Sequence, residues 1–484
     1  MSTVKIQDFR SALSPITATG SLRWGLASAY YLLANLFHLG LGNALFYDDW
    51  YFYEPVNLYP EKWRACAVDV CKFPLLPFES EVVQIGVFGH RLLTILTIWI
   101  SGVTFWKILR ATRCLREWEL SMATVLFLVM PILGARVSIA GTRIMLMLML
   151  FLIGCFLVTK HHIVGPAIGV LLLGTAPVHP SFQFFLVIPV VLLVICDANG
   201  AGRISRKTLV IATILLSFAL VHRYVIPDFW VRTGLLAPEV GYNSIGLNSL
   251  SRAVLVCGAL AAPMLVDIAR HLQSGARSLK FRTSLFKVGL SVLAVGTLPY
   301  MMVGHFANFS DWITPFLPDN SEWDSRHQLL QGFGYALVVP GLLSSLVERA
   351  RARAFSVILL TCLGLSMSMF GNYYVDSLKQ RDVMSGLRDS AVALEHPVRL
   401  QFVDDAVSLN ARGRVVRTYE WQGMAERAIG SEVLVVRNQD QAVGCVGARA
   451  GTRVTIRQIS GRLRGLISRT PVVNLEFTDL VECQ

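Results

Sequence analysis

The chain has 484 residues, of which 54% are hydrophobic and 16% are charged, and its mean hydropathy is +0.54. Soluble domains carry about 25% charged residues, so this composition excludes an ordinary soluble enzyme. A formal charge of +12 would suggest nucleic-acid binding in a soluble chain, but here the basic residues form short clusters between apolar stretches. Each of these stretches is roughly 17 to 25 residues long, the length that crosses a bilayer. We therefore expect a polytopic membrane protein.

The first apolar stretch lacks the small-residue cleavage pattern of a signal peptide, so we expect it to remain as the first transmembrane helix. Ten further stretches have the composition of membrane spans. The expected helices are 24–46, 85–106, 119–134, 144–159, 163–177, 181–196, 208–222, 252–268, 284–302, 328–347 and 355–372. The short helices at 163–177 and 181–196 also fit a re-entrant pair. The sequence thus predicts an all-α bundle of about eleven transmembrane helices within residues 1–372.

The distribution of basic residues predicts the orientation of this bundle. Lysine and arginine are retained on the cytoplasmic side in the short loops of membrane proteins. If the N-terminus lies inside, the inner segments carry more than twice as many of these residues as the outer short loops. We therefore expect a multi-pass protein of the cell inner membrane, with a cytoplasmic N-terminus and, after eleven spans, an extracytoplasmic C-terminus.

The last part of the chain, residues 373–484, has a different composition. It is rich in charged residues and contains no apolar run of membrane length. Short β-branched segments at 432–436 and 453–456 lie between turn residues, which is typical of strands. Residues 376–395 have the spacing of a helix. We expect a small, soluble, extracytoplasmic α/β domain that is joined to the last span by this helix.

Nine cysteines are scattered through the chain. Five of them lie in or next to expected spans, where a small buried hydrophobe is the simplest interpretation. Cys66 and Cys71 share the first outer loop, and Cys445 and Cys483 share the tail. On an oxidising face of the membrane each of these pairs could close a disulfide.

The most informative segment is the end of the first span, where Asp48 and Asp49 stand among aromatic residues between Phe46 and Pro55. Two adjacent carboxylates are costly close to hydrocarbon, and here they lie at the depth of the lipid headgroups. One interpretation is an aromatic belt with a solvated acidic turn. The other is a site that acts on a substrate held at the membrane surface.

An acidic pair that opens the first outer loop directly after the first helix resembles the GT-C superfamily of integral membrane glycosyltransferases. The resemblance extends to the many spans and the soluble C-terminal domain. It implies transfer of a hexose or pentose from a polyprenyl-phosphate donor to a glycan, lipid or protein acceptor, with Asp48 or Asp49 as the base or as the group that orients the acceptor. We prefer Asp49, because it lies further from the span and should reach a cavity more freely. No cofactor is certain, and two carboxylates alone form a sparse site for Mg²⁺ or Mn²⁺.

A departing phosphate also requires cations on the same face of the membrane. Arg326 and His327 open the tenth expected helix, where a phosphate would also meet free backbone N–H groups. Arg136 and Arg143 bracket a short loop that can bury them only in the bundle. Each of these arginines has an alternative role as a snorkelling anchor. Further side chains expected to contact the substrate are Tyr47, Trp50, Glu54, His90, Arg91, His179 and Trp323.

Two other functions fit the same architecture. A transporter or flippase of a lipid-linked glycan typically carries ionisable residues in mid-span. Here the ionisable residues concentrate at the interfaces, and Asp267, the candidate for a charge inside a span, lies near an inner end. A polysaccharide polymerase or ligase would share the chemistry of the glycosyltransferase and differ in substrate length. Acidic residues outnumber basic ones in the outer loops, which suits sugars and one phosphate and argues against a nucleic-acid partner.

Overall fold

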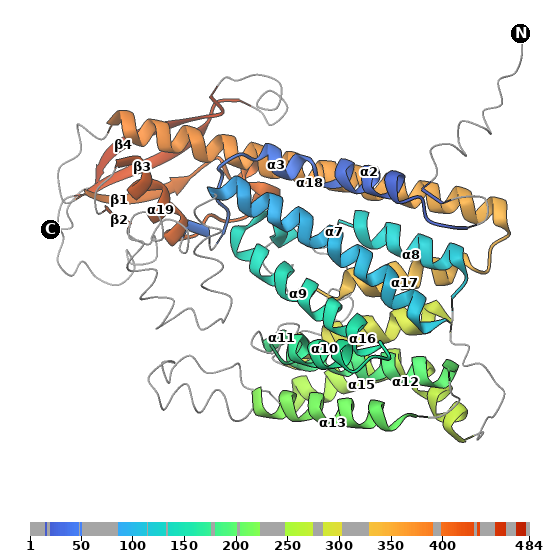
Figure 1. Ribbon diagram of the computed structural model, residues 1–484. Helices are drawn as coiled ribbons and strands as arrows, with labels where there is room; N and C mark the ends of the chain where they lie inside the picture. The colour runs from blue at the N-terminus through green and yellow to red at the C-terminus, as the bar shows by residue number, and fades with distance from the viewer. Residues whose placement is uncertain are drawn as a thin grey trace, which may run out of the picture.

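The structure of the chain is a computed structural model, and it is mostly helical with one small sheet near the C-terminus (Figure 1). It describes residues 15–16, 20–47, 49–50, 86–113, 115–131, 134–175, 180–200, 204–222, 247–273, 284–302, 329–390, 398–429, 433–435, 451–460 and 471–480. All structural statements below concern these residues.

Apolar helices occupy the part of the chain that precedes the sheet. They are α2 (Trp24–Asn35), α3 (Phe37–Gly40), α7 (Gly86–Thr112), α8 (Glu117–Val129), α9 (Ile139–Val158), α10 (Val164–Thr175), α11 (Pro180–Phe185), α12 (Val187–Gly200), α13 (Arg206–Leu220), α15 (Leu247–Gln273), α16 (Leu285–Met302), α17 (Gln331–Leu343) and α18 (Glu348–Ser390). A 3-10 turn, η1 (Gly134–Val137), precedes α9. Each of the eleven expected stretches therefore contains a helix, and the stretch 181–196 is divided between α11 and α12.

Four helices of the described part are long and apolar enough to cross a membrane. They are Gly86–Thr112, Asn248–Arg270, Leu285–Met302 and Glu348–Ser390. Four shorter apolar segments are Ile144–Val158, Val164–Thr175, Phe182–Asp197 and Gln331–Leu343. These lengths agree with a helical membrane protein. The count of eleven spans, the type of membrane and the orientation stay predictions.

Helix ends that the charge pattern places on the cytoplasmic side lie close together in the bundle. The ammonium groups of Lys107 and Lys160 lie 5.6 and 4.1 Å from the centre of the same Phe156 ring. The guanidinium carbon of Arg351 lies 3.9 Å from the ring centre of Trp118, at the start of α8. These contacts bring together the C-terminal ends of α7 and α9, and likewise the N-terminal ends of α8 and α18.

Helix α18 joins the bundle to the sheet without a break, and it has 43 residues (Figure 1). At 1.5 Å per residue it is about 65 Å long, roughly twice the thickness of a bilayer's hydrocarbon core. Its second half therefore extends beyond the bundle and packs against the sheet. The last expected span and the expected helix at 376–395 are one element, and the expected boundary at residue 373 falls inside it.

The sheet has four strands in the order β2-β1-β3-β4. The strands are β1 (Val398–Asp404), β2 (Val433–Val435), β3 (Gly451–Gln458) and β4 (Val473–Leu480). Strand β1 is parallel to β2 and β3, whereas β3 and β4 are antiparallel. After β1 come the 3-10 turns η8 (Val407–Leu409) and η9 (Ala411–Gly413) and then helix α19 (Thr418–Ile429), which leads into β2. The small α/β region is confirmed, with β2 and β3 at the two expected strand segments, whereas its extracytoplasmic position stays a prediction.

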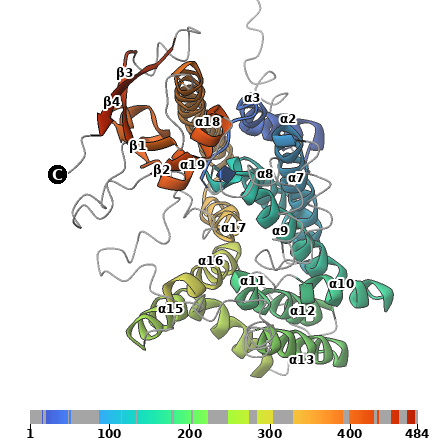
Figure 2. The same ribbon diagram turned by 90° about the vertical axis from the view of Figure 1, so that its left-hand side faces the viewer.

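The hydrophobic core of the sheet region is shared with the bundle. Leu45 and Trp50, from the segment after α3, and Val87, from the start of α7, are buried in the same cluster as the strand residues. Trp50 packs so closely on α19 that a Cβ added at Gly423 would lie 2.9 Å from its ring. Figures 1 and 2 both show α18 and α19 beside the sheet. The end of the first expected span is thus built into the junction between bundle and sheet.

Candidate functional site

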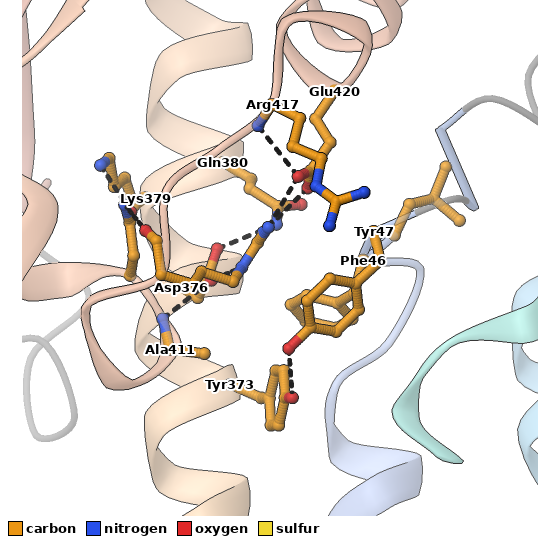
Figure 3. Close-up of polar contacts among 12 residues, drawn as sticks. Phe46, Tyr47, Tyr373, Asp376, Lys379, Gln380, Ala411, Arg417 and Glu420 are labelled. Atoms are coloured by element: carbon orange, nitrogen blue, oxygen red, sulfur yellow. Dashed lines mark hydrogen bonds and ion pairs between the residues drawn. The ribbon is translucent and has the colours of Figure 1, made fainter. Parts of the chain in front are cut away.

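The segment that carries the acidic pair folds into this junction. Tyr47 is 4% exposed and has a φ of 57°, in the left-handed region that is uncommon for residues other than glycine. Its hydroxyl forms a 2.7 Å hydrogen bond with that of Tyr373, and its ring centre lies 4.8 Å from the guanidinium carbon of Arg414 (Figure 3). These contacts hold the unusual backbone in place. The described contacts of Tyr47 are internal, and its contact with a substrate stays a prediction.

Asp49 is 1% exposed and its carboxylate is engaged by the protein itself. One oxygen accepts a hydrogen bond from the backbone N–H of Phe46 at 3.1 Å, and the other accepts one from the Ser138 hydroxyl at 2.5 Å. Ser138 is the N-cap residue of α9, so this carboxylate ties the turn after α3 to the start of another helix. The expectation that Asp49 reaches a cavity freely is therefore wrong. Asp48 lies outside the described residues.

Arg91 and His90 lie inside the bundle, as expected from their position near the outer start of the second span. Arg91 is 2% exposed and donates a 2.6 Å hydrogen bond to the carbonyl oxygen of Ala44 and another to that of Gly42. The guanidinium is also attracted electrostatically by Asp49. Arg91 thus fixes the loop that carries the acidic pair, and the described contacts give it a positioning role.

Arg136 is buried in the bundle, as its short loop predicts. It is 5% exposed, and its guanidinium carbon lies 5.6 Å from the ring centre of Phe370. Two of its nitrogen atoms, Nε and one terminal nitrogen, have no hydrogen-bond partner in the described part of the chain. Burial lowers the pKa of Arg136 to about 10, and the nearby Tyr31 opposes this shift. A buried guanidinium with unused N–H groups is costly by itself and can accept an anion.

A buried ion network lies next to Tyr47 (Figure 3). The Asp376 carboxylate accepts hydrogen bonds from Arg414 Nε at 3.0 Å and from the backbone N–H of Ala411 at 2.9 Å. Arg414 also donates to both oxygens of Glu420, at 2.8 and 2.7 Å. Burial acts to lower the pKa of Arg414, but the two carboxylates raise it well above its usual range. The sequence gave no signal for this network, because its members are common residue types on separate elements.

A cavity of about 400 Å³ lies at the same junction, and the sequence analysis missed it. It is lined by Gly40, Leu41, Asn43, Ala44, Leu45, Trp50, Tyr374, Ser377, Leu378, Gln380, Arg381, Met384, Arg388 and Arg427. Its walls come from the segment after α3, from the second half of α18 and from α19. The available signal was the seven-residue spacing of Arg381 and Arg388, which places both on one face of the helix expected at 376–395.

Several expected site residues cannot be placed. Outside the described residues lie Asp48, Glu54, Cys66, Cys71, His179, Trp323, Arg326, His327, Cys445 and Cys483, and the side chain of Arg143 is likewise not described. The described cysteines Cys155, Cys196, Cys257 and Cys362 form no disulfide bond. Within the described ranges, no group of three or more histidine, cysteine, aspartate or glutamate side chains is arranged to hold a metal ion.

No family model, no curated protein and no solved structure matches this chain. A functional assignment therefore depends on the chemistry of the residues that meet at the junction. Three features meet there. They are the segment after the first helix that carries Asp49, the buried Arg136 with two nitrogen atoms that have no described hydrogen-bond partner, and a cavity with three arginines in its wall.

Proposed function

We propose that the protein is a membrane glycosyltransferase that moves a sugar from a polyprenyl-phosphate donor to a glycan, lipid or protein acceptor on the extracytoplasmic face. The observation that supports this proposal is the convergence at one end of the bundle of the acidic segment, buried Arg136 and the arginine-lined cavity. These groups come from parts of the chain that are far apart in sequence. A carboxylate and cations on the same side of a membrane are what transfer from a lipid phosphosugar requires.

In the proposed reaction the acceptor hydroxyl oxygen attacks the anomeric carbon of the donor sugar. The bond between that carbon and the phosphate oxygen breaks, and polyprenyl phosphate leaves with the electron pair. The hydroxyl proton passes to a carboxylate of the acidic pair, which must lie within hydrogen-bond reach. Arginine N–H groups stabilise the negative charge that develops on the phosphate. In this scheme Arg136 binds the phosphate together with Arg326, the phosphate ligand expected from the sequence.

The contacts of Asp49 indicate different roles for the two carboxylates in the proposed reaction. Both oxygens of Asp49 already accept hydrogen bonds, from Phe46 and Ser138. We therefore assign Asp49 the role of holding the turn and assign proton acceptance first to Asp48.

The test uses the full-length protein in nanodiscs with a panel of radiolabelled polyprenyl-phosphate sugars and cell-envelope acceptor fractions. Release of polyprenyl phosphate and labelling of an acceptor are both measured. Asp48→Asn should lower turnover by about 10²-fold or more with an unchanged thermal midpoint, the range of general-base catalysis. Asp49→Asn should lower both turnover and the midpoint, because an amide leaves Phe46 N–H or Ser138 facing a donor, a cost of about 1–3 kcal/mol.

Asp405→Asn is the matched control, because Asp405 is an exposed carboxylate of the sheet region and its side chain makes no described contact. This variant should behave as the wild type does. Wild-type turnover in both Asp48→Asn and Asp49→Asn would refute the catalytic assignment and leave the aromatic-belt interpretation.

The alternatives are separated by the same preparation in liposomes. Movement of intact donor between leaflets without release of sugar would identify a transporter or flippase. A ladder of products of increasing length would identify a polymerase, and transfer of a whole oligosaccharide would identify a ligase. A single sugar added to the acceptor is the result expected from the proposal.

A further inference from the structure

The cavity at the junction continues an apolar helix surface that a bilayer would cover. On α18, Val357, Leu360 and Met367 are 62%, 65% and 43% exposed and recur at nearly helical spacing. Tyr374 continues this surface and lines the cavity. One face of α18 therefore passes from exposed apolar residues in the span directly into the cavity wall.

A second apolar surface reaches the cavity from the first span. Leu33, Leu36 and Phe37 are 48%, 53% and 48% exposed on α2 and α3. Helix α3 ends at Gly40, which lines the cavity, and a Cβ added there would meet nothing within 4 Å. Figure 1 shows α2 and α3 lying along α18, and these helices are in contact. Two lipid-accessible surfaces thus meet at the open end of the cavity.

The opposite wall of the cavity is basic. Arg381, Arg388 and Arg427 line it, and none of the described lining residues is an aspartate or a glutamate. Arg381 forms an ion pair with the neighbouring Asp382 at 3.1 Å. Arg388 has no ion-pair partner among the residues that the structure describes. Three guanidinium groups in the wall of one cavity make that wall attractive to an anion. Arginine forks match the oxygens of a phosphate group.

We propose that this cavity binds the phosphate head of a phosphomonoester lipid, whose hydrocarbon chain lies along the exposed apolar faces of α18 and α3. A monoester carries up to two negative charges, so it suits three arginines better than the single charge of a bilayer phosphodiester. The volume of about 400 Å³ falls in the range of small-ligand pockets and accommodates the head with the first part of its chain. As a seat for the polyprenyl phosphate that leaves after transfer, separate from the donor phosphate that Arg136 and Arg326 would bind, the assignment rests on the proposed function.

The experiment measures saturable binding of radiolabelled farnesyl phosphate, a short isoprenoid phosphomonoester, to the full-length protein in phosphatidylcholine nanodiscs. Arg388→Gln should raise the dissociation constant about tenfold, and Arg381→Gln combined with Arg388→Gln about a hundredfold, through loss of charge-assisted hydrogen bonds. Arg353→Gln is the matched control, because Arg353 is an exposed arginine at the other end of the same helix. It should leave binding unchanged.

Competing ligands show whether the cavity recognises the phosphate head of the probe, its hydrocarbon chain or both. Farnesol should not displace the probe, and inorganic phosphate should do so only weakly. Nanodiscs that contain phosphatidylglycerol should retain probe binding. Complete displacement by phosphatidylglycerol, or wild-type affinity in the double variant, would overturn the proposal. Because binding is measured without turnover, intact farnesyl phosphate binding in a protein that transfers no sugar would refute the proposed function and leave the lipid-phosphate site standing.

Discussion

Lys379 has a buried ammonium group, and its neighbours satisfy it completely. It is 2% exposed, and its Nζ donates to both oxygens of Asp404 at 2.6 Å, to Asn410 Oδ1 at 2.6 Å and to the Ala406 carbonyl at 3.2 Å. These bonds fasten α18 to the loop after β1. Lys379 therefore anchors α18 to the sheet region.

Replacing Lys379 should destabilise the protein strongly. Lys379→Met leaves the Asp404 carboxylate without its partner, and loss of one member of a buried pair costs about 3–5 kcal/mol. The thermal midpoint in nanodiscs should fall by several degrees. Arg381→Met removes an exposed guanidinium that pairs with Asp382 on the same helix and should cost less than about 1 kcal/mol. Equal midpoints for the two variants would show that Lys379 does not fasten the helix.

Arg326 remains the leading phosphate ligand of the sequence analysis, and it lies outside the described residues. If its guanidinium binds the donor phosphate through two hydrogen bonds, a lysine cannot replace that planar fork. Arg326→Lys should therefore weaken donor use markedly although the charge is kept, and Arg326→Ala should weaken it further. Transfer rates at several donor concentrations measure the effect. Kinetics like those of the wild type in the lysine variant would make Arg326 a snorkelling anchor and shift the phosphate role to Arg136 or Arg143.

Single residues were predictable where loop length or membrane depth limits their position. The burial of Arg136 follows from its short loop, and that of Arg91 follows from its position near the start of the second expected span. The state of Asp49 did not follow, because its partner Ser138 begins another helix and no local pattern connects the two. Arg414 was missed for the same reason, since its burial depends on carboxylates from α18 and α19.

At the scale of elements, close helix packing depends on glycines in α16 and α17. A Cβ added at Gly341 would lie 2.4 Å from the backbone nitrogen of Phe286, and one added at Gly289 would lie 2.7 Å from that of Val338. Small residues at these positions let the two backbones approach each other, as is common between membrane helices.

This packing predicts opposite outcomes for two glycines of the same helix. Gly341→Ala forces α16 and α17 apart and should lower the free energy of unfolding by about 1–3 kcal/mol, the cost typical of overpacking, with a measurable fall in the thermal midpoint. At Gly332, also on α17, an added Cβ would meet nothing within 4 Å, so Gly332→Ala should be neutral or slightly stabilising. A larger loss for Gly332→Ala than for Gly341→Ala would contradict the packing.

Helix positions followed from apolar stretches, but helix lengths did not. Helix α8 ends at Val129, two residues before Pro131, although the expected span continued to residue 134. Helix α18 was expected as two elements because its composition changes from apolar to charged near residue 373. That change records the passage from lipid to water outside the helix, whereas the backbone continues without interruption.

At the scale of the whole molecule, the charge asymmetry predicts which face of the membrane the junction occupies. A topology reporter fused after Gln484 should report the outer side of the membrane, and a matched fusion after Lys280, in an expected inner loop, should report the cytoplasm. Protease protection or reporter activity in cells measures both. A cytoplasmic signal after Gln484 would place the acidic segment and the arginine cavity on the inner face and remove the proposed extracytoplasmic transfer.

The shared core imposes an order on biosynthesis. Tyr47 and Tyr373 are hydrogen-bonded although they are 326 positions apart, and Leu45 and Trp50 share a core with strands that are made much later. The segment after α3 therefore keeps an apolar surface uncovered until the sheet region has been made. Contacts between segments so far apart in sequence form slowly, and until they form the uncovered apolar surface is prone to misassembly. A nascent chain that stops before β1 would hold every expected span and still present Trp50 to chaperones and proteases.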